Sequence, residues 1–217
     1  PRLEQHVQVD VVHVASRPMS APPALHELVA ARLYHDLVNP LSAIGNGTAL
    51  LRGAPGDAGL VDLVADAGAG ALARLTLLRL AFGPAPGGAS IAGAEVAQAL
   101  LRDPPAARLA VDWTCAAPLP RAEARAGLLA AMCAASACGA RGRITVARSA
   151  AGDWRIAAQS PRPVALPGLW ALAEGAVPPP ADLAPREVHF ALLPAALAAL
   201  GRRLRRTGAE GDLILAF

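Results

Sequence analysis

Apolar and polar residues recur with a helical period over residues 24–51, which predicts one long amphipathic helix. At about 100° per residue, one side of this helix is apolar and the opposite side is polar. The polar side is centred on His35 and carries Asn39, Ser42 and Asn46 within roughly 40° of that histidine. The apolar side is formed by Leu33, Leu37, Leu41, Ile44, Thr48 and Leu51.

A second helical pattern occupies residues 57–82, after the breaker Gly53-Ala54-Pro55-Gly56. Asp57 is suited to cap this helix, and Arg74 and Arg79 lie late in it, where they complement the helix dipole. A single hairpin of two such helices leaves part of each apolar face uncovered, whereas two copies packed as a four-helix bundle cover both. We therefore expect a homodimer. The apolar positions of the second helix are Leu60, Val64, Ala67, Ala71, Leu75, Leu78 and Phe82.

Beyond this hairpin, short stretches of alternating apolar and polar residues come between helical patterns, as in Arg143-Ile144-Thr145-Val146-Ala147-Arg148. This mixture predicts an α+β fold with two layers. In chain order we expect a helix at 93–102, a strand at 108–114, a helix at 121–138, strands at 142–147 and 153–158, a short helix at 169–174, a helix at 185–200, and strands at 202–206 and 212–217.

Segments rich in glycine and proline, together with changes in composition, divide the chain into four parts. We expect residues 1–20 to form an extension, in which Met19 is a candidate natural start. Residues 21–83 are expected to form the helical hairpin, residues 84–88 a linker, and residues 89–217 the α+β domain.

Composition narrows the possible functions. The 217 residues are 54% hydrophobic but only 3% aromatic, so the core must consist mainly of alanine, leucine and valine. All 20 basic residues are scattered arginines and the net charge is only +3, so we expect no nucleic-acid partner. Cys115, Cys133 and Cys138 form no C-x-x-C pair, which favours a reducing compartment. Without a signal peptide or a membrane-spanning stretch, we expect a soluble, cytoplasmic protein that has no membrane partner.

The run His35-Asp36-Leu37-Val38-Asn39-Pro40 carries the candidate chemistry of the chain. Imidazole changes charge near neutral pH, and as a nucleophile it forms covalent intermediates. Asp36 is placed to hydrogen-bond one ring nitrogen and leave the other free, while Asn39 lies one helical turn further on. Pro40 has no N–H to donate, so we expect the helix to bend just past the histidine. His35, Asp36 and Asn39 are the candidate catalytic residues.

This run resembles the phosphoacceptor box of two-component sensor kinases, H-E/D-L-x-N/T-P. With Ala31 to Leu51 and Arg79-Leu80-Ala81-Phe82-Gly83, the chain is similar to bacterial histidine phosphotransferases of the ChpT type. The resemblance implies a dimeric helical hairpin that forms a four-helix bundle, followed by a degenerate ATPase-like domain of the histidine-kinase kind. It is specific in the first helix and rests on topology in the second half of the chain.

The elements with which that kinase domain binds ATP are missing from this sequence. The helix at 121–138, which should carry asparagine for magnesium and phosphate, has none. The strand that should lead into Asp-x-Gly leads into Gln159-Ser160-Pro161-Arg162-Pro163. The expected glycine-rich lid contains Pro178, Pro179 and Pro180, which have no N–H groups to offer phosphate. We therefore expect neither ATP nor any other cofactor on this chain.

A phosphoacceptor without an ATP site suits a phosphorelay. The resemblance implies that His35 takes a phosphoryl group from the receiver domain of a hybrid histidine kinase and passes it to the receiver of a response regulator. The receiver is expected to bring the magnesium ion. A receiver that reaches His35 must lie along the polar side of the first helix, so we expect docking at Arg32, Ser42, Ala43 and Asn46.

Two other interpretations stay open. One is a non-catalytic dimeric scaffold or antagonist that docks receivers, and the other is a fragment of an active kinase. The remaining candidate residues are better explained by packing. His189 is expected in the core or at its boundary, and Trp113, Trp154 and Trp170 are expected to pack within the second domain.

Overall fold

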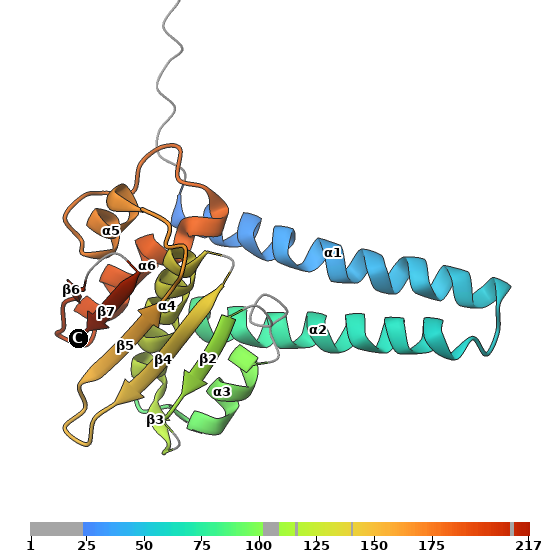
Figure 1. Cartoon of the computed structure of the whole chain (residues 1–217), viewed down its shortest axis with the longest axis horizontal. Coiled ribbons are helices and arrows are strands. Elements are labelled where there is room, and N and C mark those ends of the chain that lie inside the picture. The colour runs from blue at the N-terminus through green and yellow to red at the C-terminus, as the bar shows by residue number, and fades with distance from the viewer. Residues whose placement is uncertain (1–23, 102–108, 116, 140, 209–210) are drawn as a thin grey trace, which may run out of the picture.

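The computed structural model describes residues 24–101, 109–115, 117–139, 141–208 and 211–217 (Figure 1). The expected extension, residues 1–20, lies outside the described residues. A long helical hairpin projects from a compact α+β body, as the sequence predicts. Among the described helices, none combines the length and the apolar character that crossing a bilayer requires.

The hairpin consists of α1 (Leu25–Gly53) and α2 (Ala58–Phe82), which pack side by side along their length. Asp57 caps α2 by accepting a hydrogen bond of 3.1 Å from the Leu60 N–H, which confirms the predicted cap. A side chain at Gly47 would collide with Cγ2 of Val64, so glycine lets the two helices approach closely there. The first helix continues through Pro40 without interruption.

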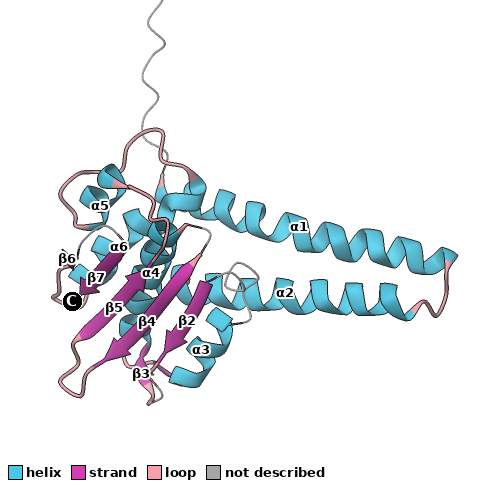
Figure 2. Cartoon of the chain, viewed as in Figure 1, coloured by secondary structure: helices cyan, strands magenta, loops and turns pink. Residues whose placement is uncertain are grey.

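The body is built on a five-stranded sheet with helices packed against it (Figure 2). Its strand order is β2-β4-β5-β7-β6, in which only β2 and β4 are parallel. A separate two-stranded ladder pairs β1 with β3. The strands are β1 (Ser90–Ile91), β2 (Leu109–Trp113), β3 (Leu119–Pro120), β4 (Gly142–Arg148), β5 (Trp154–Gln159), β6 (Arg205–Thr207) and β7 (Asp212–Ala216). The helices are α3 (Gly93–Leu101), α4 (Arg121–Cys138), α5 (Pro167–Ala173) and α6 (Val188–Ala198), preceded by the 3-10 turn η2 (Pro185–Glu187).

The core lies between the sheet and α4, whose alanines and cysteines allow close packing. Gly127 of α4 makes room for the ring of Trp154, and that ring stacks on Phe217 at 5.9 Å between centroids. Trp113 contacts Trp154 at 5.6 Å, and Trp170 packs against Phe190 at 5.4 Å. The three tryptophans therefore pack within the body, as predicted.

Two expectations about the body were wrong. The strand expected at 202–206 begins only at Arg205, and the Arg202 side chain donates to the carbonyl of Gly152 at 2.7 Å. The helix expected at 185–200 starts as a 3-10 turn and becomes α-helical only from Val188. The pairing of β1 with β3 was missed, since two-residue strands show no alternation that a sequence can reveal.

Candidate functional site

His35 stands on the outer surface of α1, with 75% of its side chain exposed. Its Nδ1 lies 3.1 Å from Oδ1 of Asp36, whose own side chain is only 6% exposed. An exposed ring is thus tied to a buried carboxylate by a single contact. The other ring nitrogen, Nε2, makes no contact of this kind within the described residues.

The second oxygen of that carboxylate, Oδ2, is held by two arginines. Arg32, one turn earlier on α1, donates from Nε at 2.6 Å. Arg74 of α2 donates from Nε at 3.0 Å and from Nη2 at 2.6 Å. We call Arg32, Asp36 and Arg74 the Asp36 clamp. It joins the two helices of the hairpin directly beneath the exposed histidine.

The clamp keeps Asp36 ionised. Burial by itself raises the pKa of this carboxyl, but the hydrogen bond from His35 and the charges of Arg74 and Arg32 outweigh burial, so the pKa is lowered. An ionised carboxylate can only accept hydrogen bonds, so Nδ1 of His35 must be the donor. The imidazole then keeps its lone pair on Nε2, on the exposed side of the ring.

The clamp also touches the α+β body. Nη1 of Arg32 donates at 2.8 Å to the carbonyl of Arg186, in the turn that precedes α6. His189 of α6 is buried nearby, with its Nε2 3.1 Å from Oγ of Ser136. Burial and the neighbouring charges of Arg32 and Arg74 lower the pKa of His189 to about 3, so it is neutral at physiological pH. The core position expected for His189 is confirmed.

The residues predicted for docking lie in different settings. Asn39, Ser42 and Asn46 are exposed along the same side of α1 as His35, and Ala43 is half-buried. Arg32 departs from the expectation, because only 13% of its side chain is exposed and its guanidinium bonds Asp36 and the second domain. The Arg32 guanidinium therefore makes its contacts within the chain, and the exposed surface around His35 includes amide, small and apolar side chains.

Arg74 was missed as a site residue. Its position late in α2 matched the helix dipole, and this match gave a sufficient local explanation for the charge. The sequence did contain one relevant signal: Asp36 falls on the flank of α1 between the polar and apolar sides, where a neighbouring helix must meet it. Identifying the partner required knowing how α1 and α2 align.

The hairpin leaves large apolar side chains in the open. On α1, Leu41 is 58% exposed, and on α2, Leu72 is 67% exposed. By helical spacing, Leu41 lies about 120° around the axis of α1 from His35, whereas Val38 and Leu50 lie only about 60° from it. The other exposed large hydrophobic residues of the hairpin are Tyr34, Val38, Leu50, Val61, Leu63 and Leu75.

In the α+β body, the segment after β5 is held in place by side-chain hydrogen bonds. The hydroxyl of Ser160, just after β5, donates to the carbonyls of Cys138 at 2.9 Å and Arg141 at 3.0 Å. Alanine is the commonest residue of α4, and the helix contains no asparagine. Among the described residues, no three histidine, cysteine or acidic side chains gather as metal ligands.

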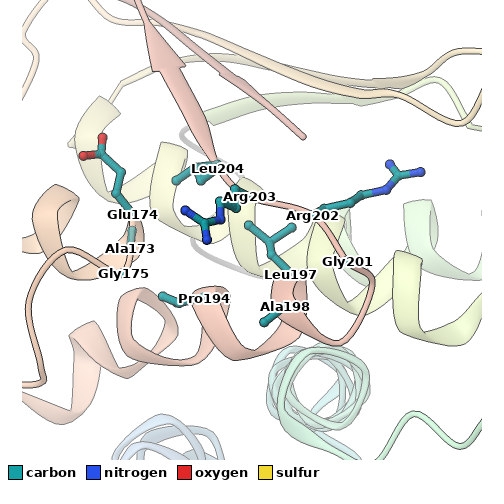
Figure 3. A pocket seen from close by; sticks show the side chains of 10 residues that line it. All are labelled: Ala173, Glu174, Gly175, Pro194, Leu197, Ala198, Gly201, Arg202, Arg203 and Leu204. Carbon is teal, nitrogen blue, oxygen red and sulfur yellow. The ribbon is translucent and has the colours of Figure 1, made fainter.

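One cavity of about 480 Å³ opens between α5, α6 and the segment that leads to β6 (Figure 3). Its lining comes entirely from the α+β body, so it is separate from His35. Two of its polar side chains are already bonded: Glu174 to Arg206 at 2.8 Å, and Arg202 to backbone carbonyls. The carboxylate of this lining, Glu174, is already paired with Arg206, so the hairpin remains the candidate site.

Comparisons with known proteins identify the family to which the chain belongs. Residues 94–210, more than half of the chain, match the family model of the histidine phosphotransferase C-terminal domain. A solved structure of a bacterial phosphotransferase has a TM-score of 0.70 at 20% identity, covering 88% of this chain and 94% of that one. Histidine kinase AdeS of Acinetobacter baumannii has a TM-score of 0.41 at 14% identity, covering 84% and 95%. No curated protein gives a significant sequence match.

Proposed function

The chain belongs to the histidine phosphotransferase family, and from this premise we propose that His35 is the residue that carries the phosphoryl group in a phosphorelay. The donor is an aspartyl phosphate on the receiver domain of a hybrid kinase, and the final acceptor is an aspartate on the receiver of a response regulator. The observation that carries this proposal is the exposed imidazole whose Nδ1 is tied to a buried, ionised Asp36.

The chemistry follows from that arrangement. The lone pair of His35 Nε2 attacks the phosphorus of the aspartyl phosphate, an N–P bond forms, and the bond between phosphorus and the aspartate oxygen breaks. The donor aspartate leaves as a carboxylate, while Asp36 accepts the Nδ1–H and supports the charge that develops on the ring. Transfer to the second receiver reverses these steps. Asn39, exposed one turn beyond, is assigned to orienting the incoming group or a water molecule.

The relay needs no nucleotide on this chain. The asparagine-free α4 and the proline-rich segment after α5 lack the groups that hold magnesium and phosphate in kinase domains of this fold. We propose that the receiver supplies the magnesium ion and that this chain binds neither ATP nor a metal. The receiver docks on the side of α1 that carries Ser42, Ala43 and Asn46.

We also propose that two copies pair through their hairpins. The exposed apolar residues of α1 and α2, such as Leu41 and Leu72, form a face too apolar to remain in water. A second copy offers the same face, and packing the two produces a four-helix bundle. His35 stays outside that bundle, where a receiver can reach it.

The test uses a receiver domain labelled at its aspartate with radioactive phosphate. Mixed with the wild-type chain, it should transfer an acid-labile label within minutes, whereas His35→Gln should take none. His26→Gln serves as the matched control, because His26 is also exposed on α1 and should leave transfer unchanged. Circular dichroism should show that both variants keep their helix content.

A second arm replaces the labelled receiver with labelled ATP and magnesium. We expect no label on the chain in this arm, and label on His35 would restore the kinase interpretation. If the wild type binds receivers but takes no label from them, the chain is a docking scaffold or antagonist.

A further inference from the structure

We propose that Arg74 is a positioning residue for phosphotransfer: through Asp36, it fixes which nitrogen of His35 is free to react. This inference rests on the proposed role of His35. Arg74 itself is 11% exposed and donates to the carboxylate of Asp36, so we propose that its effect on the imidazole passes through that carboxylate.

The first step of the argument is how the carboxylate is shared. Three N–H donors converge on Oδ2 of Asp36: Nε of Arg32 at 2.6 Å, and Nε and Nη2 of Arg74 at 3.0 and 2.6 Å. They leave Oδ1 to accept from Nδ1 of His35 at 3.1 Å. The torsion that turns a carboxylate is soft, so these donors decide which oxygen faces the ring.

The second step is that Arg74 is the member of the clamp that comes from another helix. Arg32 and Asp36 both belong to α1 and can move together, whereas Arg74 belongs to α2 and holds the carboxylate in place relative to the hairpin. Arg74 also supplies two of the three donors. Because all three clamp side chains are largely buried, their charges are poorly screened by solvent.

The third step concerns the ring. In an unrestrained neutral histidine, the proton favours Nε2, and this tautomer has no lone pair on the exposed nitrogen. A fixed acceptor at Nδ1 reverses the preference and leaves Nε2 ready to attack phosphorus. Replacing the acid that plays this part in a serine protease with an amide costs about 10⁴-fold, because the wrong tautomer then prevails. Loss of Arg74 leaves the acid in place, so we expect a smaller effect.

The variant is Arg74→Gln, with Arg79→Gln as its matched control. Arg79 lies on the same helix, five residues on, and its side chain is 68% exposed, with a carboxylate oxygen of Glu95 no closer than 3.8 Å. We expect Arg74→Gln to slow acceptance of phosphate from a labelled receiver at least roughly tenfold, about 1.4 kcal/mol. Arg79→Gln should transfer at the wild-type rate, and Arg74→Lys should recover part of the loss.

The tautomer is measured directly by nitrogen-15 NMR of the histidine rings, with the His35 signals identified by their loss in His35→Gln. In the wild type and in Arg79→Gln, the proton should lie on Nδ1; in Arg74→Gln, it should shift toward Nε2. A merely structural role of Arg74 would lower the melting temperature without moving the proton.

Two outcomes overturn the inference: an unchanged tautomer in Arg74→Gln, or transfer at the wild-type rate. If Arg74→Gln does not fold, Arg74→Lys provides the same two readouts. If the wild type accepts no phosphate at all, the proposed function fails, and the NMR signals still decide whether Arg74 positions the ring.

Discussion

His189 is a buried histidine whose neutral form is favoured by the fold. It lies on α6 against Ser136 of α4, and Arg32, Asp36 and Arg74 approach it from the hairpin. Burial first, and then the two arginines, lower its pKa to about 3, whereas in an unfolded chain a histidine takes up its proton near about 6.5. Between these values, the unfolded chain binds more protons than the folded one.

Stability should therefore fall as the pH drops below about 6.5, by up to about 1.4 kcal/mol per pH unit for this one group. Urea unfolding at intervals from pH 6.5 to 4.5 should show that slope in the wild type and a shallower one in His189→Leu. His26→Leu, which changes an exposed histidine, should keep the wild-type slope. Equal slopes in all three chains would mean that His189 is hydrated or charged in the fold.

At the same scale, the sequence predicted the exposed histidine but only part of its surroundings. The exposure of His35 and its bond to Asp36 followed from helical spacing and adjacency. The contact of Arg74 with Asp36 did not, because it joins residues 38 positions apart on different helices. The burial of Arg32 depends in turn on a backbone carbonyl of the second domain, at Arg186.

At the scale of the elements, the two helices of the hairpin show how much the periodicity of apolar residues predicts about secondary structure. Their existence and their apolar faces were predictable, since more than 20 residues in each repeat the helical pattern. Strongly patterned elements such as α4 were predicted with the observed bounds. Elements set by tertiary contact, such as the short ladder of β1 with β3, were missed.

The apolar face of the hairpin gives the element-scale prediction. Leu72 is 67% exposed, so Leu72→Glu should leave the fold of the single chain intact. In the proposed dimer, the substitution buries one charge in each copy and removes about 1.5–3 kcal/mol of apolar burial per copy. We therefore expect association to be weaker by at least roughly a hundredfold. Sedimentation over a concentration series should show monomers with unchanged circular dichroism.

Val177→Glu is the control for that experiment, because Val177 is an exposed apolar residue of the α+β body. It should sediment like the wild type. If Leu72→Glu remains as dimeric as the control, the two copies must pair elsewhere or not at all.

At the scale of the whole molecule, we expect a receiver domain to dock on the side of α1 that carries His35. Ala43 is half-buried beside Asn39 and Asn46, and its small side chain allows a partner to approach closely. Ala43→Arg should slow transfer from a receiver at least roughly tenfold, about 1.4 kcal/mol, with unchanged circular dichroism.

The matched control for Ala43→Arg is Ala54→Arg, which adds the same charge at the exposed tip of the hairpin. At 19 residues from His35 and about 1.5 Å of rise per residue, this tip lies roughly 28 Å away. Its transfer rate should match the wild type. If both variants accept phosphate at the same rate, the receiver does not dock on this side of α1.

The Asp36 clamp also has a charge balance. It places two guanidinium groups and one carboxylate beneath the histidine. A phosphoryl group brings about two negative charges near neutral pH, so loading makes the site more negative. The loaded site is then stabilised by any cation that comes close. In the proposed relay, that cation is the magnesium ion of the receiver.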